Sequence, residues 1–111
     1  MNIPGLLVQN EKGLYCPAAD IYIDPWKSVK KALITHGHSD HARNGHKEYL
    51  CVNESVGILR TRLRAKNING IPFGETISIN GVKFSFHPAG HIVGSAQIRV
   101  EHKGEVLGGF R

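Results

Sequence analysis

Short segments in which apolar residues alternate with polar ones, or follow one another without a break, recur along the chain. Such segments, separated by turn residues, are typical of β-strands. The run at 31–35 is almost entirely apolar, which indicates a strand buried on both faces, and Asn80-Gly81 is a strong signal for a tight hairpin turn. The strands expected from this pattern cover residues 6–8, 14–16, 20–24, 31–35, 49–52, 75–80, 82–87, 95–102 and 105–107.

Helical periodicity is clearest between residues 54 and 66. Val56, Leu59 and Leu63 have the spacing of one helix face and are expected to point into the core. The basic residues around this stripe predict a solvated helix face, the preferred interpretation, or a phosphate-binding surface. They are Arg60, Arg62, Arg64 and Lys66.

Two further segments complete the expected secondary structure. Ser39 or Asp40 can cap a short helix from Asp40 to His46, and residues 67–74 are expected to form a loop. The pattern as a whole predicts one strand-rich domain with two helices, of the α/β (α+β) class.

The composition limits the classes of protein to which the chain can belong. Its 111 residues are enough for one small domain, and 41% hydrophobic and 21% charged residues are usual for globular proteins. Without a membrane-spanning run or a signal peptide, we expect a cytoplasmic protein with no membrane partner. Cys16 and Cys51 are then expected to be reduced and buried. The formal charge of +5 is compatible with a nucleic-acid partner.

A dense group of metal-ligand residues follows the apolar strand at 31–35. The sequence from His36 to His41 reads His-Gly-His-Ser-Asp-His, and imidazole and carboxylate groups are standard zinc ligands. His36 and His38 are two residues apart, so at a strand end both project from the same face. Asp40 and His41 can then begin a second metal position, as in two-metal sites.

His91, in the turn Pro88-Ala-Gly-His, is the expected third partner of His36 and His38. Three histidines with an open position for water form a catalytic zinc arrangement. The metal would lower the pKa of its bound water towards neutrality. Asp24, at the end of its strand, is either a carboxylate that orients a ligand histidine or a turn residue before Pro25.

These motifs resemble the metallo-β-lactamase fold, and more narrowly its β-CASP branch, whose members cleave DNA or RNA. The stretches Gly13-Leu-Tyr-Cys-Pro17 and Asp20-Ile-Tyr-Ile-Asp-Pro-Trp26 are similar to the bacterial exonucleases associated with DNA ligase. The resemblance covers nearly the whole chain and implies the N-terminal part of a four-layer αββα sandwich, with metals at the sheet edges.

The resemblance also implies roles for individual residues. The metal ligands would be His36, His38, Asp40, His41 and His91, and the residues taking part in catalysis would be Asp24, Asp40 and His41. The cofactor implied is Zn²⁺, one or two ions, with Mn²⁺ as an alternative. The partner implied is nucleic acid, with DNA preferred, together with a functional link to a DNA ligase.

The chain departs from the family pattern near its end. Gly109 stands where the family has a metal-bridging aspartate, and the β-CASP insert and last metal ligand would lie beyond Arg111. Residues 1–111 are therefore expected to be a partial domain, truncated before the fourth metal motif, with poor binding of the second metal. The expected function is that of a metal-dependent phosphodiester hydrolase, a DNA exonuclease, with activity impaired in this chain. The alternatives are an RNA-processing nuclease, a small-molecule hydrolase of the same fold, and an inactive metal-binding remnant.

Overall fold

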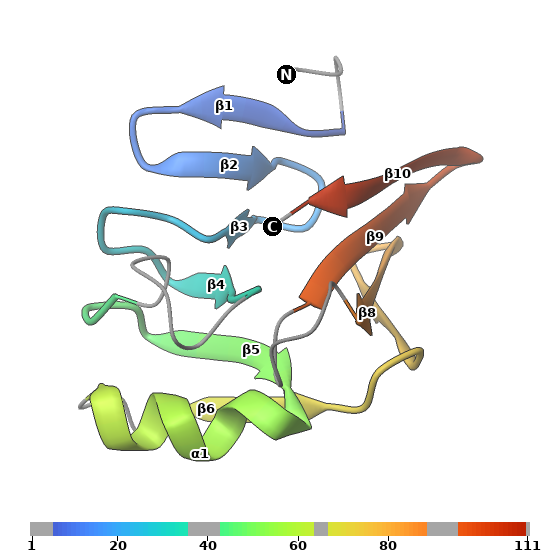
Figure 1. Cartoon of the computed structure of the whole chain (residues 1–111). Coiled ribbons are helices and arrows are strands. Elements are labelled where there is room, and N and C mark those ends of the chain that lie inside the picture. The colour runs from blue at the N-terminus through green and yellow to red at the C-terminus, as the bar shows by residue number, and fades with distance from the viewer. Residues whose placement is uncertain (1–5, 36–42, 64–66, 89–95, 111) are drawn as a thin grey trace.

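A computed structural model of the chain describes residues 6–35, 43–63, 67–88 and 96–110, and these residues form two facing sheets and a helix. The first sheet has six strands in sequence order (Figure 1). The first three pair antiparallel, and the third to the sixth pair parallel. The strands are β1 (Val8–Asn10), β2 (Gly13–Cys16), β3 (Ile21–Ile23), β4 (Lys31–Leu33), β5 (Glu48–Val52) and β6 (Ile68–Ile71).

The second sheet is an antiparallel meander in the order β10-β9-β8-β7. Its tight turns fall at Asn80-Gly81 and Lys103-Gly104, where all four residues have positive φ values between 50° and 84°, as type I′ hairpin turns require. The strands are β7 (Thr76–Ile79), β8 (Val82–Pro88), β9 (Ala96–His102) and β10 (Glu105–Phe110).

The helix α1 (Asn53–Arg62) connects β5 to β6 and packs on both strands. Leu59 and Leu63 are buried against Tyr49 and Cys51, and Val56 packs against the same cluster. The predicted apolar face of this helix is therefore confirmed. The helix ends earlier than expected, because Leu63 already has extended backbone angles. Arg60 and Arg62 in its last turn are exposed to solvent.

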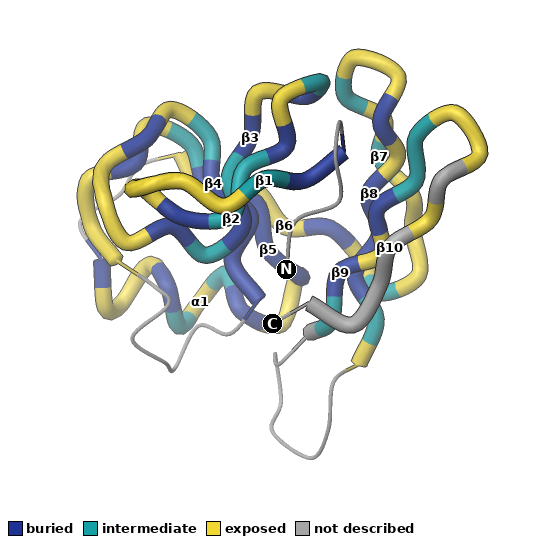
Figure 2. Tube along the Cα trace, turned by 90° about the horizontal axis from the view of Figure 1, so that it is seen from above, coloured by how far each residue is buried: buried dark blue, intermediate teal, exposed yellow. Residues whose placement is uncertain are grey.

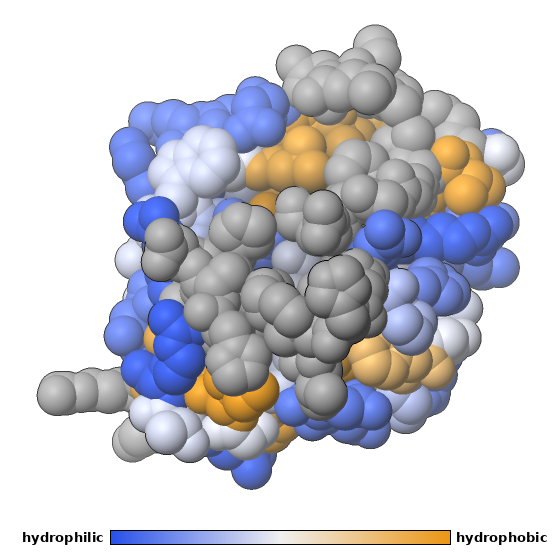
Figure 3. Space-filling model, in the orientation of Figure 1, coloured by the Kyte–Doolittle hydropathy of each residue, from blue (hydrophilic) through white to orange (hydrophobic). Residues whose placement is uncertain are grey.

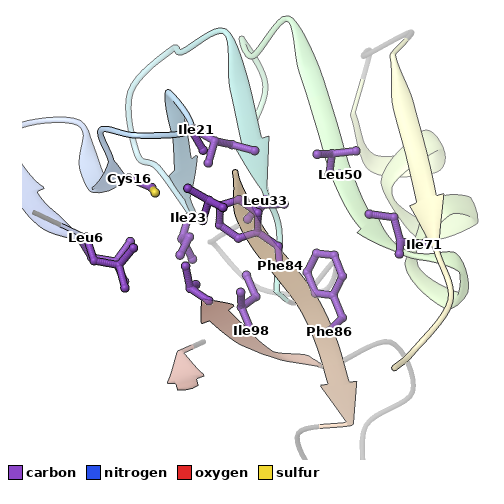
Figure 4. Packing of buried hydrophobic residues seen from close by; sticks show 14 of the residues in the cluster. Leu6, Cys16, Ile21, Ile23, Leu33, Leu50, Ile71, Phe84, Phe86 and Ile98 are labelled. Atoms are coloured by element: carbon purple, nitrogen blue, oxygen red, sulfur yellow. The ribbon is translucent and has the colours of Figure 1, made fainter. Parts of the chain in front are cut away.

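The main core lies between the two sheets. Figure 2 shows the buried parts of both sheets facing each other, and Figure 4 shows Leu33 and Ile71 of the first sheet opposite Phe84 and Phe86 of the second. A smaller core fills the space between α1 and the opposite face of the first sheet. The described residues thus form three layers, helix, sheet and sheet. This arrangement confirms a mixed α+β class dominated by sheet, whereas the metallo-β-lactamase sandwich stays a prediction.

Two predicted elements are wrong. Residues 67–74 were expected to be a loop but contain β6, which pairs parallel with β5. Ile68 and Ile71 are buried on opposite faces of the sheet with exposed Asn69 and Gly70 between them, so these residues lack a simple alternation. In the expected helix from 40 to 46, residues 43–46 are not helical, and Gly45 has a φ of 106°. Residues 40–42 lie outside the described residues. No described helix is long and apolar enough to cross a membrane.

Candidate functional site

The parallel strands β3 and β4 end side by side, and Asp24 and Thr35 lie just beyond their carboxyl ends. The Asp24 amide donates a hydrogen bond to the Leu33 carbonyl oxygen (2.9 Å). The Asp24 carboxylate accepts two bonds from Thr35, from the backbone N–H to Oδ1 (2.9 Å) and from Oγ1 to Oδ2 (2.6 Å). Ligands of open α/β sheets bind at this edge, outside the carboxyl ends of the strands. We call residues 36–41 the histidine motif. The Asp24–Thr35 pair therefore fixes the position of the residue that directly precedes this motif.

The backbone conformation of Asp24 also keeps its carboxylate at the strand end. Its φ is 46°, in the left-handed region that non-glycine residues seldom adopt, although Asp and Asn adopt it more readily than others. This conformation turns the chain sharply after β3. The side chain then remains at the strand end, where Thr35 binds it. Asp24 is thus more than a turn residue before Pro25, because its carboxylate orients the residue immediately before His36.

A second contact network holds the chain where it leaves the histidine motif. The Tyr49 hydroxyl donates to the Arg43 carbonyl oxygen and accepts a bond from the His46 amide (3.3 Å). The His46 ring lies 5.1 Å from the Tyr49 ring, centroid to centroid, and its Nδ1 accepts a bond from the Val29 amide (3.2 Å). The described residues on both sides of 36–42 are therefore held by hydrogen bonds, Thr35 by Asp24 and Arg43 by Tyr49.

The buried imidazole of His46 carries an unused donor. Because Nδ1 accepts the Val29 hydrogen bond, the neutral ring carries its proton on Nε2. His46 is 7% exposed, and Nε2 has no hydrogen-bond partner among the described residues. Burial lowers the pKa of His46 below its ordinary value, since desolvation disfavours the charged ring. His46 thus presents, at the amino ends of β4 and β5, a neutral imidazole whose Nε2–H can donate to an acceptor.

The other predicted site residues belong to parts of the chain that the structure does not describe. His36, His38, Asp40, His41 and His91 lie outside the described residues, and so do Arg64 and Lys66. Within the described ranges, no group of three or more His, Cys, Asp or Glu residues could hold a metal ion. Gly109 lies in β10. The metal ligand set therefore stays a prediction, based on the sequence.

Three residues of these two hydrogen-bond networks were not singled out from the sequence, namely Thr35, His46 and Tyr49. Thr35 directly precedes the histidine motif at the end of an apolar run, and this position was a usable signal. His46 was assigned only to the expected short helix. Tyr49 looked like an ordinary strand residue, and its role depends on a hydrogen bond made by its hydroxyl six residues back in the chain.

Comparison with known proteins gives a substantial match to part of a longer protein. The chain is 39% identical over 97 residues to a protein of Opitutus terrae named "Probable DNA ligase". The match covers 86% of this chain, whereas the chain spans only 9% of the length of that relative. No family model matches the chain.

This comparison contradicts the predicted function. A metal-dependent nuclease or other phosphodiester hydrolase was expected, but the matched protein is named as a probable DNA ligase and not as a nuclease. The hydrolase, nuclease and exonuclease assignments are therefore wrong on this finding. The physical reason is that a cluster of histidine and carboxylate residues predicts a bound ion. It does not by itself determine which reaction at a phosphodiester that ion serves.

Proposed function

We propose that this chain is a DNA-binding part of a ligase-type protein, an enzyme that acts on DNA strands. The observation that carries the proposal is the 39% identity over 97 residues with the probable DNA ligase. The matched stretch covers most of the chain, so the identity does not come from one short motif. The sequence resembles exonucleases associated with DNA ligase, and this resemblance predicts a functional link to a DNA ligase. The name of the relative supports that part of the prediction.

The charge of the chain supports the same proposal. A protein that holds DNA neutralises backbone phosphates with lysine and arginine and thereby releases condensed counterions. The chain has a formal charge of +5. Its exposed cations include Lys30 just before β4, Lys47 just before β5 and Arg60 in α1.

A binding experiment with three labelled DNAs of equal length tests the proposal. They are an intact duplex, a duplex with one nick bearing a 5′-phosphate and a 3′-hydroxyl, and a single strand. Binding is measured by fluorescence anisotropy at about 50 mM salt, because electrostatic binding to DNA is strongest at low salt. We expect the chain to bind the nicked duplex several-fold more tightly than the intact duplex. A chain that binds none of the three DNAs, or that does not distinguish the nick, would overturn the proposal.

A further inference from the structure

A pocket of about 320 Å³ lies at the edge of the molecule opposite the Asp24–Thr35 pair. It is formed where the amino ends of β4, β5 and β6 meet the β7–β8 turn of the second sheet. The parallel pairing of Lys31 with Glu48 brings two of these strand ends together. The residues that line the pocket are Ala19, Asp20, Lys30, Lys31, Lys47, Glu48, Asn67 and Asn80.

Three lysines line this one pocket, namely Lys30, Lys31 and Lys47. Among the described residues, no ion pair within 4.0 Å joins any of these three lysines to a carboxylate. Figure 1 shows the amino ends of β4 and β5 on the left side of the molecule. In the same orientation, the described surface on that side is mainly hydrophilic (Figure 3). The pocket therefore combines concavity with unpaired positive charge.

The two carboxylates of the pocket, Asp20 and Glu48, offset part of this charge, and the three lysines leave the pocket with a net charge of +1. The Asp20 carboxylate already accepts a hydrogen bond from the Tyr15 hydroxyl (2.8 Å), and that bond is the main reason why the pKa of Tyr15 is raised to about 12. Glu48 is half-buried beside Lys31. The side-chain amides of Asn67 and Asn80 add neutral donors for phosphate oxygens.

We propose that this pocket binds a backbone phosphate of DNA, with its sugar, through Lys30, Lys31 and Lys47. The inference rests on the proposed DNA-binding function and identifies the surface that performs it. The volume lies at the low end of the range for small-molecule sites, about 300–1,000 Å³. It suits one phosphate and its sugar but not a stack of bases. Lysine binds phosphate as a compact point charge, so the pocket contributes affinity without base specificity.

A pair of charge-matched triple variants tests the assignment. The pocket variant is K30Q/K31Q/K47Q, and the control variant is K12Q/K83Q/K103Q, which removes the same charge from exposed lysines outside the pocket. Affinity for a labelled duplex is measured by anisotropy over a range of salt concentrations. We expect the pocket variant to lose at least about tenfold more affinity than the control. Its slope of log K against log salt should also fall by about 0.9 for each lysine that contacts a phosphate.

Acetylation footprinting of the unmodified chain gives a second measurement that does not depend on the folding of a variant. Mass spectrometry should show that DNA protects the pocket lysines but not Lys83 or Lys103. Inorganic phosphate and a mononucleotide serve as competitors. Protection of the pocket lysines from acetylation by either of these anions, but not by duplex DNA, would overturn the inference.

The remaining outcomes separate the two proposals. If the unmodified chain binds the nicked duplex more tightly than the intact one but both triple variants lose affinity equally, the pocket inference fails while the proposed function stands. If the unmodified chain binds no DNA, both proposals fail together.

Discussion

The carboxylate of Asp24 binds Thr35 through both of its oxygens, one to the backbone amide and one to the hydroxyl. The two residues are eleven positions apart and belong to the ends of neighbouring parallel strands. Thr35 is completely buried, and the next residue in the chain is His36. The contact thus connects the turn after β3 to the start of the histidine motif.

Removing this carboxylate should destabilise the protein. We expect Asp24→Ala to lower the free energy of unfolding by about 2–4 kcal/mol, because two hydrogen bonds are lost and a buried amide and hydroxyl of Thr35 are left without their acceptor. Asp24→Asn should cost less, since its amide oxygen can still accept one of the two bonds and its NH₂ can donate to the hydroxyl. Urea denaturation measures both. Equal losses for the two variants would show that the hydrogen bonds do not set the energetics.

The zinc prediction can be tested on the chain as it is. Three histidines suit a zinc ion, and we expect about one zinc per chain after dialysis, with loss of the ion when a chelator is added. The double variant His38→Ala/His91→Ala should retain little zinc. His102→Ala, in the β9–β10 hairpin, is the control and should retain it. Zinc content measured by plasma mass spectrometry that is the same in all three proteins would refute the ligand assignment.

The two cysteines should be unreactive in the folded protein. Burial raises the pKa of Cys51 to about 12 and also raises the pKa of Cys16, so at about pH 8 little thiolate is present to react. We expect labelling by a disulfide reagent to be slow in native buffer and rapid for both thiols in denaturant. Mass spectrometry identifies the labelled residue. Fast labelling of Cys51 in the native protein would contradict its place in the core beneath α1.

Most strands could be predicted because their side chains follow the two-residue period of a sheet. The hairpin turn at Asn80-Gly81 was predicted from residue type alone, and both residues adopt positive φ values. The strand β6 could not be predicted in this way. Ile68 and Ile71 bury on opposite faces, and the pairing with β5 decides the conformation of the residues between them.

The site could be predicted only in part. Asp24 was placed correctly at the end of its strand, but its bond to Thr35 depends on the parallel pairing of β3 with β4, which no local pattern specifies. The lysine pocket was not predicted for a similar reason. Lys30 and Lys31 are sixteen or more positions from Lys47 in the sequence and meet because adjacent parallel strands start at the same edge of the sheet.

Two glycines should respond oppositely to alanine. A Cβ at Gly70 of β6 would lie 2.8 Å from Cγ2 of Val56 and 3.2 Å from Cα of Asn53, both in α1, so Gly70→Ala should cost about 1–3 kcal/mol. A Cβ at Gly57 meets nothing within 4 Å in the described structure. Gly57→Ala should therefore stabilise the helix by up to about 1 kcal/mol. Thermal unfolding followed by circular dichroism compares the two variants. A loss of stability in Gly57→Ala would show that the added methyl group makes an unfavourable contact.

His46 should make the stability of the fold depend on pH. The folded protein needs the neutral ring, because Nδ1 accepts the Val29 amide hydrogen and burial lowers the pKa below the ordinary value of 6.5. Below about pH 6.5 the unfolded chain therefore binds a proton that the folded chain does not.

The stability that comes from this site should be fully present above about pH 6.5 and be lost as the pH falls through the lowered pKa of the folded state. The loss can reach about 1.4 kcal/mol per pH unit for one proton. In His46→Gln this contribution is absent, so its urea midpoint should approach that of the unmodified protein as the pH falls from about 7.5 to 5. The remaining histidines are common to both proteins and cancel in the difference. His102→Gln is the matched control, and a gap between variant and unmodified protein that stays constant across this pH range would rule out a buried neutral His46.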